Sequence, residues 1–152
     1  RGGNIKKTSD DFFLDNKIIF DYAFIDGLHT FEQVTKDVIN TLNATKAGSW
    51  IGIHDLIPLN WIEEHVPGYP EHHWTGDVWK SIAKLRCTRP DLEVGVIDTD
   101  WGIGIVRKGQ QVVYDKNKYE DCLNYSYLDK NREDLLNIIS TETFFTKFKN
   151  DK

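Results

Sequence analysis

Acidic and imidazole side chains follow two apolar runs in the first third of the chain. The first run, residues 18–25, ends at Asp26, and His29 follows in the next loop. The second run, residues 50–53, ends at His54 and Asp55. Two carboxylates with an imidazole can hold a divalent cation, and a histidine beside a carboxylate can act as a general base. The structural alternative is that such aspartates cap helices or order loops.

Two strands and a helix between them are predicted to position these side chains. Both apolar runs are short and rich in Ile and aromatic residues, which is typical of strands buried on both faces. Between them, apolar residues recur at helical spacing, namely Phe31, Val34, Val38 and Leu42. A strand, helix and strand in this order form a βαβ unit with parallel strands, so the polar residues that follow both strands are expected at one sheet edge.

The limits of this helix and the rest of the chain are predicted from local signals. Thr30 and Gln33 are expected to form a capping box, and the helix is expected to end at Ala47-Gly48. The later elements are a loop over 56–74 with a helical turn near Trp61, a helix over 77–85 capped by Thr75, an antiparallel hairpin of 92–97 and 101–106, and a helix over 133–148. The fold class is therefore α/β, with an incomplete parallel sheet.

Composition narrows the possible functions. The 152 residues contain 19 Lys and Arg against 24 Asp and Glu, a net charge of −5, which argues against a general nucleic-acid binder. No apolar run approaches the roughly 20 residues of a membrane-spanning helix. Cys87 and Cys122 have no metal-binding spacing, so both are expected to be reduced thiols in a cytoplasmic protein. The absence of any methionine suggests a fragment. The histidines and tryptophans of 61–79 are expected to serve mainly as loop and packing residues.

The two strand ends and their flanks resemble class I S-adenosylmethionine-dependent methyltransferases. The segment from Asp26 to His29 is similar to the Asp-Gly-x-His motif of one subgroup, and the segment ending at Asp55 is similar to its next strand. The resemblance covers roughly residues 5–108 and implies a Rossmann-like sheet that ends in an antiparallel hairpin. It also implies that Ser9, Asp10 and Asp26 contact the cofactor. From the residues alone, Ser9 and Asp10 would equally suit a helix N-terminus.

The resemblance covers only part of the family's pattern. The family's glycine-rich loop and ribose-binding acid would precede Arg1, so we expect a C-terminal half over 1–108, followed by a polar extension with a helix over 109–152. We expect such a half to bind S-adenosylmethionine weakly or not at all. The strand over 18–25 would then be an apolar edge, which predicts a homo-oligomer or other self-association through it.

The resemblance implies methyl transfer from S-adenosylmethionine to an oxygen or nitrogen of a small-molecule acceptor. Asp26, His54 and Asp55 would hold Mg²⁺ or another divalent cation, or orient the nucleophile, and His29 would be the alternative base. A metal-dependent hydrolase that uses Asp26, His29, His54 and Asp55 is a second hypothesis, and a non-catalytic assembly module is a third. Neither alternative requires the cofactor.

Overall fold

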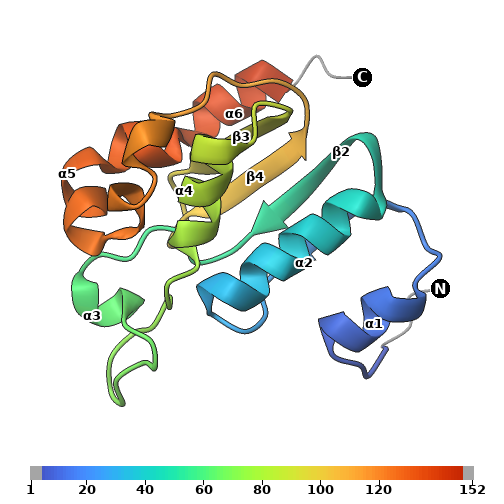
Figure 1. Cartoon of the computed structure of the whole chain (residues 1–152), viewed down its shortest axis with the longest axis horizontal. Coiled ribbons are helices and arrows are strands. Elements are labelled where there is room, and N and C mark those ends of the chain that lie inside the picture. Colours follow the sequence, from blue (N-terminus) through green and yellow to red (C-terminus); the bar gives the residue numbers. More distant parts are fainter. Residues whose placement is uncertain (1–4, 149–152) are drawn as a thin grey trace.

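A mixed sheet of five strands in the order β1-β2-β4-β3-β5 forms the centre of the molecule (Figure 1). The computed structural model describes residues 5–148, apart from the side chains of Lys116 and Phe148. The strands are β1 (Phe20–Ile25), β2 (Thr45–Ile53), β3 (Leu92–Ile97), β4 (Ile103–Lys108) and β5 (Ile138–Ile139). The α-helices are α1 (Ser9–Asp15), α2 (Phe31–Asn43), α3 (Trp61–Glu64), α4 (Trp79–Thr88), α5 (Tyr125–Leu136) and α6 (Thr141–Phe148).

The predicted βαβ unit is confirmed. Strands β1 and β2 pair in parallel, from Tyr22 opposite Trp50 to Ile25 opposite Ile53, and α2 is the connection between them. The helix is shorter than expected, because it ends at Asn43 and β2 already begins at Thr45. Ala47 and Gly48 therefore lie inside β2 and do not end the helix. Gly48 has a φ of 82°, a left-handed conformation that glycine adopts without a Cβ clash.

The predicted antiparallel hairpin is also confirmed, although its second strand begins and ends two residues later than predicted, at Ile103–Lys108. Strand β4 pairs with β3 over its full length and lies between β3 and β2, antiparallel to both. Strand β3 therefore runs in the same direction as β1 and β2. The helical turn predicted near Trp61 is present as α3. The Asn60 side chain caps it by accepting hydrogen bonds from the backbone amides of Ile62 and Glu63.

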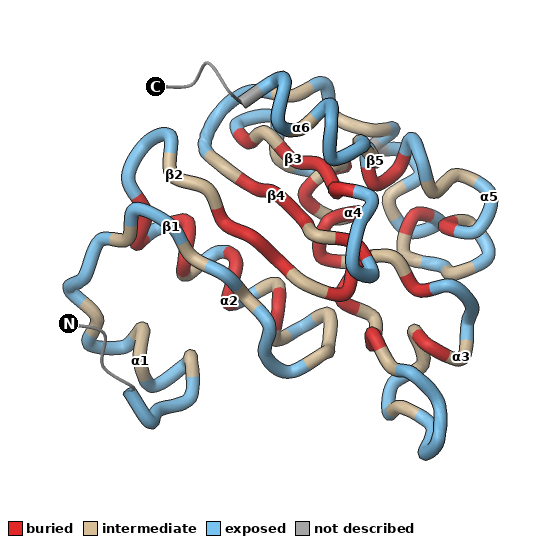
Figure 2. The backbone as a smooth tube through the Cα atoms, turned by 180° about the vertical axis from the view of Figure 1, so that it is seen from behind, coloured by how far each residue is buried: buried red, intermediate tan, exposed pale blue. Residues whose placement is uncertain are grey.

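Helices cover the two faces of the sheet unequally. Helices α2 and α4 contact each other and lie on one face, where the core side chains of alternate strand positions are buried, among them Ile51, Ile53, Val94 and Val106. Helix α6 lies on the opposite face, where the Phe144 ring meets the Trp50 ring edge-on. Figure 2 shows that this second face remains largely open beside β1 and β2.

Strand β1 is the edge of the sheet, so the prediction that it is buried on both faces is wrong. Three of its six residues are exposed and three are half-buried, with Tyr22 58% and Phe24 49% accessible to solvent. The apolar composition of the strand reflects this exposed surface as well as the side that packs on α2. The C-terminal segment does not cover this edge, because β5 pairs with β3 at the other end of the sheet.

The C-terminal segment differs from the single helix predicted over 133–148. Helix α5 ends earlier, because Asn137 takes a left-handed φ of 51° and its side-chain amide donates to the carbonyl of Val94 at 2.9 Å. The chain then enters β5, and α6 follows. Leu128, Leu135 and Leu136 are fully buried in the common core. The boundary at residue 108 stays a prediction, and residues 1–4 and 149–152 lie outside the described range.

Within residues 5–148, none of the helices combines the length and the apolar character needed to cross a bilayer.

Candidate functional site

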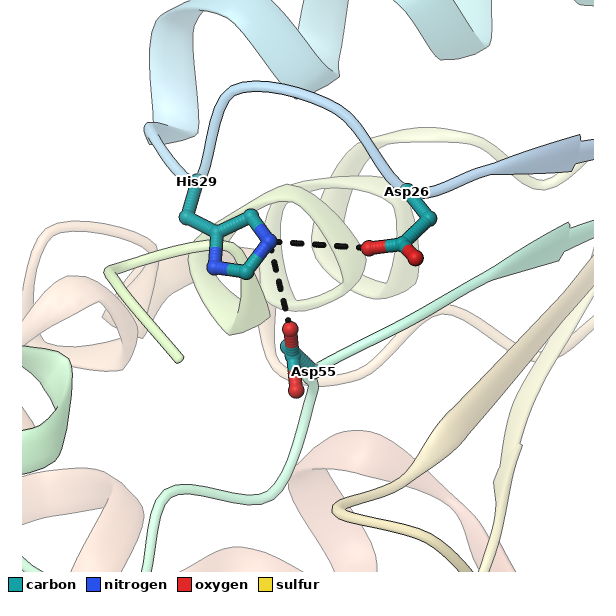
Figure 3. Close-up of side chains that lie close together, drawn as sticks. All are labelled: Asp26, His29 and Asp55. Atoms are coloured by element: carbon teal, nitrogen blue, oxygen red, sulfur yellow. Dashed lines mark ion pairs between the residues drawn. The ribbon is translucent and has the colours of Figure 1, made fainter. Parts of the chain in front are cut away.

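Asp26 and Asp55 meet at the edge of the sheet where β1 and β2 end. Because the two strands are parallel neighbours, the residue after each strand emerges on the same rim. Asp26, His29 and Asp55 each offer a ligand atom, and these atoms all lie within 4.8 Å of one another (Figure 3). Asp26 is half exposed, whereas the Asp55 side chain is only 6% accessible. The rim therefore combines one buried and one accessible carboxylate.

His29 reaches this rim from the loop between β1 and α2. Its Nε2 lies 3.5 Å from Oδ1 of Asp26 and 3.3 Å from Oδ2 of Asp55. On the other side of the ring, Nδ1 lies 3.3 Å from the carbonyl oxygen of Trp74, and the two rings are 5.2 Å apart. Gly76 makes this approach possible, because a Cβ there would lie 1.9 Å from the His29 carbonyl oxygen. The loop containing Trp74 thus fixes the orientation of His29.

His54 faces the same two carboxylates from the end of β2. Its Nδ1 lies 3.3 Å from Oδ2 of Asp55 and 3.7 Å from Oδ1 of Asp26. Its Nε2 lies 3.2 Å from Oδ2 of Asp100, in the turn between β3 and β4. All four residues predicted as catalytic, Asp26, His29, His54 and Asp55, therefore meet at one rim.

Burial and the imidazoles set the charge at this rim. Burial raises the pKa of Asp55, and the neighbouring histidines His54 and His29 reduce this rise without cancelling it. Burial lowers the pKa of His54, but the carboxylate of Asp55 and the hydrogen bond with Asp100 outweigh it, so that the net pKa is raised. A carboxylate with a raised pKa and an imidazole with a raised pKa, both facing one point, are typical of a functional site.

A cavity of about 720 Å³ adjoins the cluster along β1 and α2. Its lining includes Ser9, Asp10 and Asp26, the three residues predicted to contact a cofactor. Apolar walls come from Phe13 and Phe24. The remaining wall residues are Thr8, Phe20, Tyr22, Ala23, Ile25, Gly27, Leu28, Gln33, Asp37 and Thr41. A largely apolar cavity with a few polar groups is the usual form of a small-molecule site.

Gln33 joins the two helices that border this cavity. Its side-chain amide donates to Oγ of Ser9 at 3.1 Å, to Oδ1 of Asp10 at 3.2 Å and to Oδ1 of Asp37 at 3.0 Å. The cavity wall therefore contains a hydrogen-bonded polar group that spans α1 and α2.

The local caps differ from those predicted. Because Gln33 turns toward α1, the capping box is wrong: Thr30 makes no side-chain cap bond, and the Phe31 amide donates instead to Asp77 at 2.7 Å. Thr8 is the N-cap of α1, so Ser9 and Asp10 are free of the capping role that was their structural alternative. Thr75 donates to the carbonyl of Glu63 and does not cap α4.

Sequence reasoning missed three contributors to the rim. Asp100 was assigned only to a turn, and His73 and Trp74 only to a loop. The His73 ring contacts the Trp101 ring in a tilted arrangement, with centroids 4.2 Å apart, in the turn that carries Asp100. The signal available in the sequence was weak, because Asp100 stands three residues after the end of the predicted strand 92–97 and not directly after it.

Comparison with known proteins adds independent evidence. Residues 3–56 match the model of a family described as a methyltransferase domain. The matched part contains β1, α2 and β2, and with them all six residues predicted for the site. No curated protein matches the chain significantly. The mixed five-stranded sheet fits a Rossmann-like methyltransferase fold, and the match to residues 3–56 supports that fold for the N-terminal part of the chain.

Proposed function

We propose that this chain carries the reaction centre of an S-adenosylmethionine-dependent methyltransferase that acts on an oxygen or nitrogen of a small-molecule acceptor with the help of a divalent cation. One observation carries the proposal: Asp26 belongs both to the cluster with His29 and Asp55 and to the lining of the 720 Å³ cavity. A cation site and a small-molecule cavity that share a residue suit a reaction between two bound ligands.

The donor set at the rim fits a cation. The carbonyl of Trp74 and the carboxylate of Asp100 only accept hydrogen bonds, so the ring nitrogens that face them, Nδ1 of His29 and Nε2 of His54, carry the hydrogens. In the neutral rings, the opposite nitrogens then present lone pairs to the carboxylates. Four acceptor groups that face one another repel, and positive charge between them, from bound protons or from a cation, stabilises the cluster. A divalent ion that accepts nitrogen and carboxylate ligands supplies it.

We assign the carboxylates of Asp26 and Asp55 as ligands, together with Nδ1 of His54, which lies 3.3 Å from Oδ2 of Asp55 and 3.7 Å from Oδ1 of Asp26. His29 is the base that takes the proton from the acceptor. Its Nε2 is within hydrogen-bond reach of the cluster, and its Nδ1 is held by the Trp74 carbonyl. When bound, the cation would lower the pKa of an acceptor hydroxyl, and the sulfonium cofactor would supply the methyl group.

The cavity fits a small molecule with polar and apolar parts. Ser9 and Asp10 offer a hydroxyl and a carboxylate at one end, Phe13 and Phe24 offer aromatic surface, and Asp26 lies at the junction with the cluster. The volume lies within the range of about 300–1,000 Å³ that is common for ligand sites. We assign Ser9, Asp10 and Asp26 to the cofactor.

Chemical-shift mapping tests the cofactor part of the proposal even if binding is weak. Amide spectra of the chain are recorded while S-adenosylhomocysteine is added to millimolar concentration. The expected shifts concentrate on the cavity lining, from Ser9 to Phe13 and from Tyr22 to Asp26, and the Asp10→Asn variant weakens them. The matched control is Asp15→Asn on the same helix, outside the cavity lining. Shifts that are absent, scattered or equal in both variants contradict the assignment.

Metal titration separates the proposal from its main alternative. A metal-dependent hydrolase would use Asp26, His29, His54 and Asp55 and would need no cofactor cavity. If the chain binds Mn²⁺ while S-adenosylhomocysteine produces no shifts, the hydrolase is favoured. If neither binds, a non-catalytic assembly module is favoured. Under our assignment His54→Ala weakens Mn²⁺ binding and His29→Ala leaves it nearly unchanged. Equal losses would make His29 a ligand as well.

A further inference from the structure

The turn between β3 and β4 lies against the residues that follow Asp55. It contains three successive residues in the left-handed region, with φ of 45° at Asp100, 54° at Trp101 and 88° at Gly102. Asp55 itself has a φ of 63°. Glycine adopts this region freely and aspartate does so occasionally, but a bulky residue such as Trp101 is held there by its surroundings. Such conformations concentrate at functional sites, where they place a side chain that a relaxed backbone would direct elsewhere.

Backbone hydrogen bonds hold the turn in place. The amide of Ile57 donates to the carbonyl of Trp101 at 2.7 Å, and the amide of Leu56 donates to the carbonyl of Gly102 at 3.2 Å. A Cβ at Gly102 would lie 2.5 Å from a side-chain carbon of Ile57, so the close approach needs glycine. The turn is thereby tied to the chain immediately after His54 and Asp55. Its side chains consequently have a defined position relative to the rim.

In this position, the Asp100 side chain contacts the ring of His54. Its Oδ2 lies 3.2 Å from Nε2 of His54, on the side of the ring away from the Asp26 and Asp55 carboxylates. A carboxylate only accepts, so this contact requires the hydrogen on Nε2 and leaves Nδ1 free to bind a cation. The partner of the non-ligating nitrogen commonly fixes the tautomer and ring orientation of a metal-binding histidine.

We propose that Asp100 is a positioning residue of the reaction centre: through the strained β3–β4 turn, it holds the His54 ring with Nδ1 toward Asp26 and Asp55. This inference rests on the proposed cation site. His29 is oriented in the same manner, but by the backbone carbonyl of Trp74, which no side-chain substitution removes. Asp100 is therefore the orienting group that mutation can test. It also makes the C-terminal hairpin, outside residues 3–56, a part of the site.

The first test is Mn²⁺ affinity of the full chain, measured by calorimetric titration. Asp100→Gly removes the carboxylate and tolerates the left-handed backbone. Asp98→Gly is the matched control, since it removes an exposed aspartate from the same turn. We expect Asp100→Gly to weaken Mn²⁺ binding about tenfold or more, and Asp98→Gly to change it less than about twofold because an exposed charge is screened. Asp100→Asn, whose amide oxygen can still accept from Nε2, should restore much of the affinity. Equal effects of the two glycine variants overturn the proposal.

The second test does not depend on the metal. Long-range ¹H–¹⁵N spectra of the histidine rings report which nitrogen carries the hydrogen. In the wild-type chain His54 should be the Nε2–H tautomer, in Asp100→Gly this preference should be lost, and in Asp98→Gly it should be retained. If the chain binds no Mn²⁺, the proposed cation site fails, and the ring spectra alone decide the role of Asp100. A His54 tautomer that is the same in all variants overturns that role.

Discussion

Nε2 of His29 lies 3.3 Å from Oδ2 of Asp55, although the two residues are separated by a helix and a strand. The parallel pairing of β1 and β2 accounts for the contact, because it brings the loop after one strand beside the end of the other. Residues on two separate segments thus form one cluster around a buried carboxylate. The first prediction follows from the cost of burying that charge.

Asp55→Asn should abolish cation binding without destabilising the chain. The Asp55 side chain is 6% accessible, and the burial of a carboxylate with incomplete compensation is unfavourable. Asparagine has the same shape and tolerates the left-handed backbone. We expect the free energy of unfolding without metal to stay within about 1 kcal/mol of wild type or to rise, while Mn²⁺ binding is lost. Thermal melts and calorimetric titrations measure the two effects. A large drop in melting temperature with unchanged Mn²⁺ affinity would show a purely structural role.

Glu93→Gln should destabilise the chain at neutral pH but not in acid. Burial alone would raise the pKa of Glu93, but hydrogen bonds from Lys147 and Arg107 outweigh it and lower the pKa. A carboxyl whose pKa is lower in the folded state stabilises that state above its ordinary pKa of 4.5. The contribution is lost as the pH falls through the lowered pKa. For a partly exposed group, we expect a loss of about 1 kcal/mol at pH 7.

Urea unfolding of wild type and Glu93→Gln between pH 3 and pH 7 measures this difference. The control is Glu133→Gln, which alters an exposed glutamate on α5. The free energies of unfolding of wild type and Glu93→Gln should converge as the pH falls toward 3. The Glu133→Gln control should differ little from wild type at every pH. A difference that is constant with pH would mean that the substitution acts through packing of α6 and not through the charge of Glu93.

Leu128→Ala should destabilise the whole molecule. Leu128 lies in the segment predicted to be a polar extension, yet it is fully buried in the core shared with α4 and the sheet. Truncation of a buried leucine typically costs about 2–5 kcal/mol. Val112→Ala in the same segment removes a side chain that is 89% exposed and should cost less than about 0.5 kcal/mol. Denaturant unfolding followed by circular dichroism compares them. Similar small effects would indicate that the C-terminal segment packs independently.

The exposed edge of the sheet should cause self-association. Strand β1 pairs only with β2 in the described part of the chain, and its one charged side chain, Asp21, forms an ion pair with Lys46. Tyr22 and Phe24 are exposed beside it. Long apolar edges without protecting charges tend to pair with other chains. Light scattering over a concentration series should therefore show a molar mass that rises with concentration.

Charged substitutions locate this association. The double variant Tyr22→Lys with Phe24→Lys should shift the chain toward monomer. Leu59→Lys, at an apolar position that is 67% exposed elsewhere on the surface, should not. A wild-type chain that stays monodisperse and monomeric at all concentrations would refute the association.

The sequence alone was sufficient to predict the part of the fold that creates the rim. Apolar runs that end at Asp26 and at His54-Asp55, with a helical repeat between them, specify a βαβ unit. Parallel strands then bring their carboxyl ends to one edge whatever the rest of the chain does. The antiparallel hairpin could likewise be predicted, because two adjacent apolar runs are joined by a short turn. These features depend on local periodicity and short connections.

The tertiary structure decided the contacts between distant segments. Gln33 has the spacing of a capping box, but its side-chain amide donates to Ser9 and Asp10 of α1. The first amide of α2 donates instead to the side chain of Asp77. Asn137 interrupts what looks like one long helix, because its side chain bonds to the backbone of β3.

The partner of His54 is the clearest example. Asp100 lies 46 positions along the chain from it, and only the insertion of β4 between β2 and β3 brings them together. Local periodicity does not encode which loops will meet, because those contacts depend on the packing energy of the whole sheet.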